Sequence, residues 1–277
     1  MGSAPDYRVG WPPAASQPPE PGTGVGPLVA GRTAPSYTAT MELKEASALV
    51  TGAGRGIGRA ISLALAREGV AVTGVARSAA ELDTLVEEIE TQGGRGLAFA
   101  GDVRNASVAT GAVTAAVDHF GGLQILVNNA GVGAFANVVD TSDEDWDRVI
   151  GTNVTAVFRL TRAALPHLVH RGGHVFMISS LAGVNPIAGM AAYCASKAAL
   201  DHFATCLMLE VRQRGVKVTT IAPGSVDTQF EGAPHASDTS WMLTAEDLAR
   251  TVVDLARARD GAHLSRIEMR PARPQKR

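Results

Sequence analysis

The 277-residue chain has few cysteines, few aromatic side chains and no long apolar run. Its two cysteines, Cys194 and Cys206, have eleven residues between them, a spacing that supports neither a disulfide framework nor a metal site. Its seven histidines show no paired spacing to a carboxylate or a cysteine, so we predict no metal. No apolar run reaches the roughly 18 residues that a membrane-spanning helix needs, so we expect no membrane partner.

The chain also lacks a strong charge of either sign. Its 25 lysines and arginines against 27 aspartates and glutamates leave a formal net charge of −2, which does not favour nucleic acid as a partner. The N-terminus has no basic stretch followed by an apolar one, so we expect no secretory signal and a cytoplasmic protein. With 45% hydrophobic residues, the chain has enough apolar material for one large domain.

The first 40 residues differ in composition from the rest. Residues 1–40 are rich in proline, glycine, alanine, serine and threonine and show no apolar periodicity. We predict that they are disordered, because they bury too little surface to offset the entropy of ordering. Met41 opens an ordinary protein start, and our hypothesis is that it is the true initiator. The folded domain is expected over 41–271, followed by a frayed tail over 272–277.

From residue 46 onward, short apolar runs alternate with helical patterns. The predicted strands are 48–51, 70–75, 96–100, 123–127, 174–178, 216–221 and 264–269. The predicted helices are 57–68, 80–91, 107–120, 143–169, one ending near 214, and 245–258. This alternation predicts an α/β fold, a doubly wound, mostly parallel seven-stranded sheet with helices on both faces. Ligands of such folds bind at the carboxyl ends of the strands.

A glycine-rich turn lies between the first predicted strand and the first predicted helix. It reads Thr51-Gly52-Ala53-Gly54-Arg55-Gly56-Ile57-Gly58. Glycines at such a turn allow a tight bend and let backbone N–H groups approach a pyrophosphate at the helix N-terminus. The turn therefore predicts a dinucleotide site.

The end of the second predicted strand indicates which dinucleotide is bound. NAD sites place an acidic residue there, which accepts a hydrogen bond from the ribose 2′-hydroxyl. Here the strand ends without a carboxylate, and Arg77 together with Arg55 offers two guanidinium groups for a 2′-phosphate. We predict NADP(H), with NAD(H) as the alternative cofactor and solvated surface arginines as the alternative interpretation.

Tyr193 and Lys197 are four residues apart in a helical run, which places them on one helix face. A phenol with an unperturbed pKa of about 10 is a weak acid at neutral pH. A fixed cation beside it favours the phenolate and lowers that pKa. The pair is therefore a candidate proton donor and acceptor, although the spacing alone also occurs on many solvated helices.

Together these motifs resemble the short-chain dehydrogenase/reductase family, in its single-domain branch. The resemblance rests on the glycine spacing, on Asn128-Asn129-Ala130-Gly131, on Ser180 before Tyr193, and on Pro223-Gly224. It extends over roughly residues 43–270. It implies a Rossmann fold and an oxidoreductase that interconverts an alcohol and a ketone or aldehyde by hydride transfer. It also implies a homotetramer or homodimer.

The resemblance implies a role for each candidate catalytic residue. Tyr193 would be the general acid and base, and Lys197 would lower its pKa and bind the nicotinamide ribose. Ser180 would polarise the substrate carbonyl, with Ser179 as a structural neighbour. Asn153 would hold a water that relays protons to Lys197; a mid-helix Asn is otherwise usually solvated.

The same resemblance implies the dinucleotide contacts. Asp102 and Val103 would meet the adenine, although an Asp at a strand end is otherwise most often a cap or turn residue. Asn129 would border the cofactor or brace the central strands, and Thr228 would meet the nicotinamide carboxamide. The predicted contact residues are Thr51, Gly52, Arg55, Gly56, Ile57, Gly58, Arg77, Asp102, Val103, Asn129, Ala130, Gly131, Tyr193, Lys197, Pro223, Gly224, Val226 and Thr228.

The substrate is less well specified than the reaction. The segment 230–243 is predicted to form a lid, apolar through Phe230, Trp241, Met242 and Leu243, with His235 as a polar contact. This favours a moderately hydrophobic carbonyl, and similarity to 3-oxoacyl-[acyl-carrier-protein] reductases implies a 3-oxoacyl thioester. The ending at 267–271 lacks the Asp-Gly-Gly of those enzymes, so a general carbonyl reductase is an equal interpretation.

A second function class is a non-catalytic dinucleotide sensor on the same fold. Such a protein is expected to have lost the tyrosine, the lysine or the serine. Tyr193, Lys197 and Ser180 are all present, which favours the enzyme.

Overall fold

The computed structural model describes residues 41–228, 230, 238–258 and 261–273. Residues 1–40 lie outside this part of the chain, as does most of the predicted tail. The disorder expected there and the expected domain limits therefore stay predictions.

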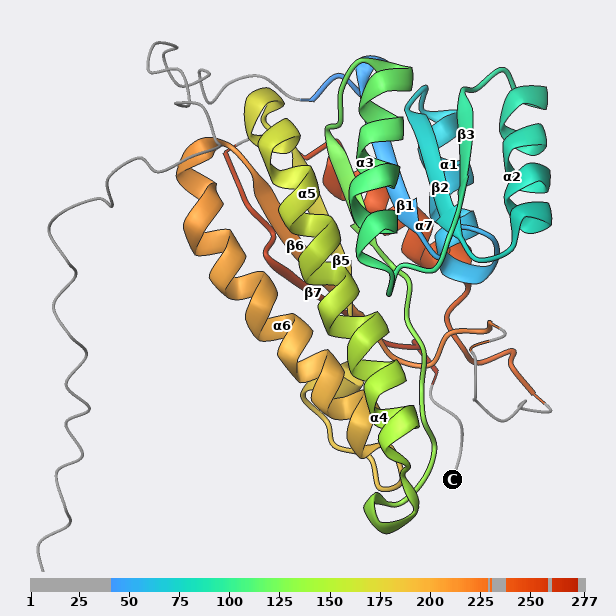
Figure 1. Ribbon diagram of the computed structural model, residues 1–277, viewed down its shortest axis with the longest axis vertical. Helices are drawn as coiled ribbons and strands as arrows, with labels where there is room; N and C mark the ends of the chain where they lie inside the picture. Colours follow the sequence, from blue (N-terminus) through green and yellow to red (C-terminus); the bar gives the residue numbers. More distant parts are fainter. Residues whose placement is uncertain (1–40, 229, 231–237, 259–260, 274–277) are drawn as a thin grey trace, which may run out of the picture. The chain divides into compact units, whose positions relative to one another are not determined.

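Seven parallel strands form one sheet in the order β3-β2-β1-β4-β5-β6-β7 (Figure 1). The strands are β1 Ser47–Thr51, β2 Ala71–Ala76, β3 Gly96–Ala100, β4 Ile125–Asn128, β5 His174–Ile178, β6 Lys217–Pro223 and β7 Arg266–Met269. The strand order reverses between β1 and β4, where successive strands are added to opposite sides. The predicted doubly wound sheet is confirmed, and its switch point lies between these two strands.

Helices cover both faces of the sheet (Figure 1). They are α1 Gly56–Arg67, α2 Ala79–Thr91, α3 Ala106–Phe120, α4 Asp143–Ile150, α5 Ala156–Arg171, α6 Ala191–Val211 and α7 Ala245–Ala256. Short 3₁₀ turns are Leu43–Glu45, Val138–Asp140, Leu181–Gly183 and Arg212–Arg214. In the described part of the chain, no helix is long and apolar enough to cross a bilayer.

Two apolar cores lie on opposite faces of the sheet. One packs α1, α2 and α7 against the sheet, and the other packs α3, α5 and α6. The central strand β1 serves both, because Ala48 and Val50 point into the first core and Leu49 into the second. All three side chains are fully buried, which explains why β1 reads as a continuous apolar run.

The region predicted as one helix over 143–169 contains a wider turn. A π turn, Gly151–Thr155, separates α4 from α5, and the backbone stays right-handed across both junctions. Such turns are rare and occur often at functional sites. This π turn carries Asn153, and Pro166 lies inside α5 as expected. Other predicted boundaries differ from the observed ones by a few residues, the ordinary uncertainty of element ends.

The core around β5 generates a stability prediction. Phe176 is fully buried, and its ring stacks on the His174 ring with centroids 3.9 Å apart. We expect Phe176→Ala to lower the free energy of unfolding by about 3–5 kcal/mol, because it removes buried apolar surface and leaves a cavity. Denaturant unfolding measures the change.

The matched control is Val139→Ala, since Val139 is 89% exposed. Its effect should stay within about 0.5 kcal/mol. Equal losses in the two variants would contradict the placement of Phe176 at the centre of the core.

Candidate active site

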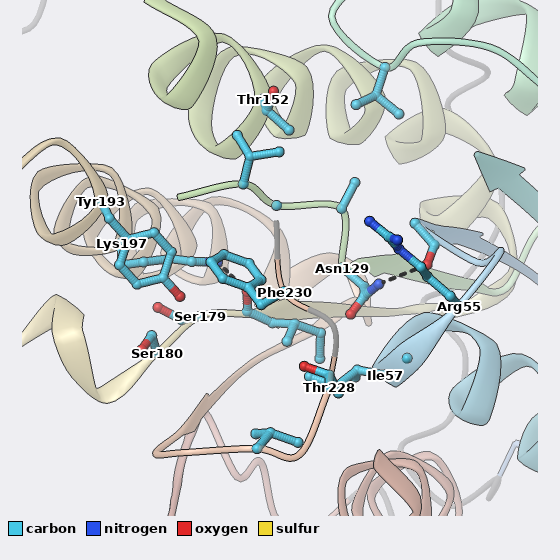
Figure 2. Close-up of a pocket in the computed structure, with 18 of the residues that line it drawn as sticks. Arg55, Ile57, Asn129, Thr152, Ser179, Ser180, Tyr193, Lys197, Thr228 and Phe230 are labelled. Atoms are coloured by element: carbon cyan, nitrogen blue, oxygen red, sulfur yellow. Dashed lines mark hydrogen bonds between the residues drawn. The ribbon is translucent and has the colours of Figure 1, made fainter. Parts of the chain in front are cut away.

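A cavity of about 1140 Å³ lies at the carboxyl ends of the strands (Figure 2). It is lined from the β1–α1 turn, from the segments that follow β2 to β6, and from α6. Most of the predicted site residues line it, namely Gly52, Arg55, Gly56, Ile57, Arg77, Asp102, Val103, Asn129, Ala130, Gly131, Ser180, Tyr193, Lys197, Pro223, Gly224, Val226 and Thr228. Thr51, Gly58 and Asn153 do not line it.

The glycine turn brings backbone close to the cavity. Gly52 and Gly56 have φ of +65° and +55°, which favour glycine. A Cβ on Gly58 would lie 2.2 Å from the Gly52 carbonyl oxygen, so α1 approaches the turn closely only because position 58 has no side chain. Helix α1 begins at Gly56 with no side-chain cap, so its first backbone N–H groups can bind an anion.

Thr51 and Asn129 connect the two central strands. The Thr51 hydroxyl accepts from the backbone N–H groups of Asn129 and Ala130, both at 3.0 Å. The Asn129 amide donates to the Thr51 carbonyl at 2.8 Å. Thr51 therefore braces the two strands. Asn129 braces them too and lines the cavity, and its contact with the cofactor stays a prediction.

Asp102 is bound by a neighbouring arginine. The Arg104 guanidinium lies 2.7 Å from its carboxylate, and the Arg104 backbone N–H donates to it at 2.9 Å. These hydrogen bonds, with the charges of Arg104 and Arg77, hold the pKa of the Asp102 carboxyl below its usual value against the effect of burial. Asp102 and Val103 line the cavity, and the Asp102 carboxylate is turned to Arg104. Their contact with the adenine stays a prediction.

Glu81 lies at this end of the cavity and was not predicted from the sequence. Glu81 lines the cavity in the first turn of α2, and a Cβ on Gly54 would collide with its carboxylate. An acid thus lines the same cavity as Arg55 and Arg77. The available signal was Ser78, whose hydroxyl caps α2 by accepting from the Glu81 N–H at 3.3 Å. A cap at 78 places residue 81 in the first turn, next to the glycine turn.

At the other end of the cavity, Tyr193, Ser180 and Lys197 lie together. The Tyr193 hydroxyl points toward the end of β5, where Ser179 and Ser180 lie (Figure 2). Ser180 is fixed because its hydroxyl accepts from the Ala182 N–H at 3.1 Å. The Lys197 ammonium lies 5.7 Å from the Tyr193 ring centroid and donates to a backbone carbonyl of β5 at 2.8 Å.

Burial sets the protonation of this group. It raises the pKa of Tyr193, although the hydrogen bond with Ser180 acts the other way. The expected lowering of the Tyr193 pKa is therefore wrong, because the loss of solvent around the phenol outweighs its polar contacts with the protein. Burial also lowers the pKa of Lys197 to about 8, against the opposing charge of Asp201.

Asn153 is fully engaged with protein groups. Its amide exchanges two hydrogen bonds, both 2.9 Å, with the backbone of Val132. It also donates to the Ser196 hydroxyl at 2.9 Å, next to Lys197 on α6. Asn153 thereby ties the π turn to the loop after β4 and to α6. Its role in holding a water stays a prediction.

The apolar wall near Tyr193 was predicted only in part. Phe230 lines the cavity, and its ring meets the Tyr193 ring edge-on with centroids 5.6 Å apart. Trp241, Met242 and Leu243 do not line it, and His235 lies outside the described residues. The lining residues that the sequence analysis did not single out include Phe135, Arg148, Leu181, Ile187 and Met190.

A doubly wound parallel sheet with a tyrosine, a lysine and a serine at its carboxyl edge defines a class of α/β oxidoreductase. A model of the family described as short chain dehydrogenase matches residues 46–238. The chain therefore belongs to the short-chain dehydrogenase/reductase family and is an oxidoreductase of that family.

Individual relatives agree with this assignment. The chain is 34% identical over 220 residues to a probable tetrahydroxynaphthalene reductase of Zymoseptoria tritici, spanning 79% of this chain and 81% of that protein. It is 37% identical over 194 residues to the 3-oxoacyl-[acyl-carrier-protein] reductase FabG of Vibrio cholerae, spanning 70% and 78%. A short chain dehydrogenase from Burkholderia cenocepacia, solved in complex with NADP, superposes with a TM-score of 0.77 at 33% identity, spanning 83% and 98%.

The close approach at the glycine turn generates the next prediction. We expect Gly58→Ala to lower the thermal unfolding midpoint in the absence of dinucleotide, by an amount equivalent to about 1–3 kcal/mol. The reason is that its new Cβ meets the Gly52 backbone oxygen, which is too constrained to move away.

Gly151→Ala is the matched control, since its Cβ would find ordinary contact 3.7 Å from the Arg104 side chain. It should leave the midpoint nearly unchanged. A Gly58→Ala protein as stable as this control would refute the close approach.

Proposed function

We propose that the protein is an NADP(H)-dependent oxidoreductase that interconverts a ketone or aldehyde and an alcohol. The observation that carries this proposal is that one cavity joins a glycine turn and two arginines to the Tyr193, Ser180 and Lys197 group. The first set suits a phosphorylated dinucleotide, and the second suits proton transfer to a carbonyl oxygen.

The residues on the dinucleotide side fit such a ligand. The uncapped N-terminus of α1 offers N–H groups to a pyrophosphate, and the missing side chain at Gly58 permits the approach. Arg55 and Arg77 offer guanidinium groups to a 2′-phosphate. When bound, the nicotinamide ring donates or accepts the hydride. The solved Burkholderia cenocepacia relative in complex with NADP supports the same choice.

The protein's own residues handle the proton. The raised pKa of Tyr193 keeps the phenol protonated at neutral pH, the form that donates to a carbonyl oxygen during reduction. The Ser180 hydroxyl, already fixed by Ala182, lies where it can donate to the same oxygen. Lys197, with a pKa of about 8, carries its charge at neutral pH and stabilises the phenolate that remains after transfer.

An apolar carbonyl suits the wall beside Tyr193. Phe230, Phe135, Ile187 and Met190 line the cavity, and this apolar lining suits an apolar substrate. The two curated relatives are named as reductases of tetrahydroxynaphthalene and of 3-oxoacyl-[acyl-carrier-protein]. These names support carbonyl reduction and keep a general carbonyl reductase and a 3-oxoacyl thioester reductase as the two candidates. The cytoplasmic location and the homotetramer or homodimer stay predictions.

The first functional prediction concerns the proton donor. We expect Tyr193→Phe to lower kcat/KM for carbonyl reduction by about 10²–10⁴-fold, because it removes the transferred proton and keeps the ring. NADPH oxidation is followed at 340 nm over a panel of apolar ketones and 3-oxoacyl thioesters, and NADPH affinity is measured by titration calorimetry.

NADPH affinity should be little changed in this variant. Undiminished turnover in Tyr193→Phe would defeat the proposed mechanism. Tight NADPH binding by the parent protein with no turnover on any carbonyl would instead favour the non-catalytic sensor.

The second functional prediction concerns dinucleotide choice. We expect Arg77→Asp to shift the NADPH/NADH preference toward NADH by about tenfold or more, since a charge-assisted hydrogen bond contributes about 1.5–3 kcal/mol. Glu81→Gln should shift the preference the other way, because it removes an anion from the cavity that Arg55 and Arg77 also line. Ratios of kcat/KM for the two cofactors report the shift.

Arg67→Asp is the matched charge reversal, because Arg67 pairs with Gln92 and does not line the cavity. Its cofactor ratio should equal that of the parent. An unchanged ratio in Arg77→Asp would overturn the assignment of the 2′-phosphate to Arg77.

A further inference from the structure

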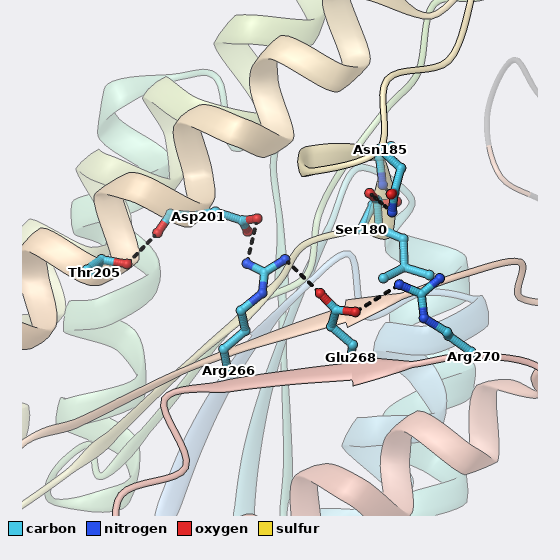
Figure 3. Close-up of polar contacts among 9 residues, drawn as sticks. Ser180, Asn185, Asp201, Thr205, Arg266, Glu268 and Arg270 are labelled. Atoms are coloured by element: carbon cyan, nitrogen blue, oxygen red, sulfur yellow. Dashed lines mark hydrogen bonds and ion pairs between the residues drawn. The ribbon is translucent and has the colours of Figure 1, made fainter.

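A buried carboxylate lies one helical turn beyond Lys197. Asp201 follows Lys197 by four residues on α6 and is 9% exposed. One of its oxygens accepts from the Arg266 guanidinium at 2.7 Å (Figure 3). The other oxygen has no hydrogen-bond partner among the residues that the structure describes. The proton-transfer mechanism above does not use this side chain.

Arg266, on the edge strand β7, belongs to an ionic row of four side chains of alternating charge, Asp201, Arg266, Glu268 and Arg270. Its guanidinium lies between the carboxylates of Asp201 and Glu268 (Figure 3), 3.6 Å from the latter. Glu268 pairs in turn with Arg270 at 2.9 Å. Residues two apart on a strand share a face, which brings these three side chains together. Asp201 is the buried end of the row, and Glu268 and Arg270 are exposed.

Asp201 also packs against the turn that carries Ser180. A Cβ on Gly183 would lie 2.8 Å from the Asp201 carboxylate and 3.1 Å from the Lys197 carbonyl oxygen. The turn Leu181–Gly183, which the Ser180 hydroxyl caps, therefore rests directly on α6 at these two residues. The carboxylate thus lies against the turn that follows Ser180, next to the point where this turn meets the backbone of Lys197.

We propose that Asp201, itself held by Arg266, is a positioning residue that keeps the buried Lys197 side chain in its charged ammonium form. The proposal deepens the proposed function and rests on it, because the ammonium is the group that stabilises the Tyr193 phenolate. Burial disfavours the ammonium, and a carboxylate one turn away on the same helix face offsets part of that cost. The direction of the Lys197 pKa agrees, since Asp201 opposes the lowering by burial.

Few other charges face Lys197. On α6 the titratable neighbours are Tyr193 and Asp201, and Cys194 adjoins Tyr193. From β5 it meets a backbone carbonyl, and from the loop after β4 it meets Gly131. The cation of β7, Arg266, lies on the far side of the Asp201 carboxylate. Asp201 is therefore the anion that acts on Lys197 within the described residues.

A direct measurement is practical because the chain contains four lysines, Lys44, Lys197, Lys217 and Lys276. Full-length protein labelled with ¹³C at lysine Cε gives one NMR signal for each lysine, and Lys197→Arg identifies the signal of Lys197. Titration of that signal between pH 6 and 11 reports its pKa. Parent, Asp201→Asn and Glu268→Gln proteins are compared.

We expect the Lys197 signal of Asp201→Asn to titrate at lower pH than in the parent, by about half a unit or more, because an anion has been removed. Glu268→Gln is the matched control. It also removes one negative charge from the ionic row, but at its exposed part on β7. Its Lys197 signal should therefore titrate as in the parent. A folded Asp201→Asn protein whose Lys197 titrates as in the parent overturns the proposal.

Arg266→Gln is a second, independent test of the proposal if Asp201→Asn does not fold. Removing this cation leaves the Asp201 charge less compensated, so the Lys197 signal is expected to titrate at higher pH than in the parent. An anchor that merely joins β7 to α6 would lower thermal stability in both variants without moving the two titrations in opposite directions. An unmoved titration in Arg266→Gln counts against the proposal.

Turnover gives a second readout. Reduction needs the protonated tyrosine beside the ammonium, so the descending limb of kcat/KM against pH should move to lower pH in Asp201→Asn and stay in place in Glu268→Gln. The NMR titration needs no substrate. A protein that reduces no carbonyl but shows the expected titration shift therefore refutes the proposed function and not the coupling of Asp201 to Lys197.

Discussion

The burial of one ammonium group is the constraint on which the site depends. Lys197 lies almost wholly out of water, where a charge is costly unless polar groups meet it. The β5 carbonyl accepts from it at 2.8 Å, and this contact fixes α6 against the sheet. Because Tyr193 stands one turn before Lys197 on the same helix, fixing the lysine also fixes the phenol. The position of Tyr193 is therefore set by the contact that Lys197 makes with β5.

The two ends of the cavity are held in place by different kinds of interaction. Near the glycine turn the order is in the backbone, where the missing side chain at Gly58 and the brace between Thr51 and Asn129 bring two strands and a helix into close contact. Near Tyr193 the order is in side chains, where burial, the Ser180 cap and the Asn153 amide act together. The first end depends on shape and the second on electrostatics, so substitutions should affect binding and proton transfer separately.

Local patterns in the sequence predict most of the fold and much of the site. The glycine turn and the Tyr193 and Lys197 pair are each specified within eight residues, and the regular alternation of strands and helices then places them at one edge of the sheet. The π turn escaped prediction because its periodicity is close to that of an α-helix. The contact of Asp201 with Arg266 joins residues 65 apart and leaves no local signal. The pKa of Tyr193 was expected in the wrong direction because burial is a property of the packed protein and cannot be read from spacing.

The strand order fixes the distance between positions along the carboxyl edge of the sheet. Arg77 follows β2 and Ser180 follows β5, with β1 and β4 between them. Neighbouring strands lie about 4.8 Å apart, so these two positions are separated by three intervals, about 14 Å along the edge. A ligand that reaches both must lie extended across the strand ends. Because β1 packs alternate side chains into two cores, a one-residue slip of this strand would exchange its buried faces. This packing holds β1 in register and keeps the strand ends aligned along the edge.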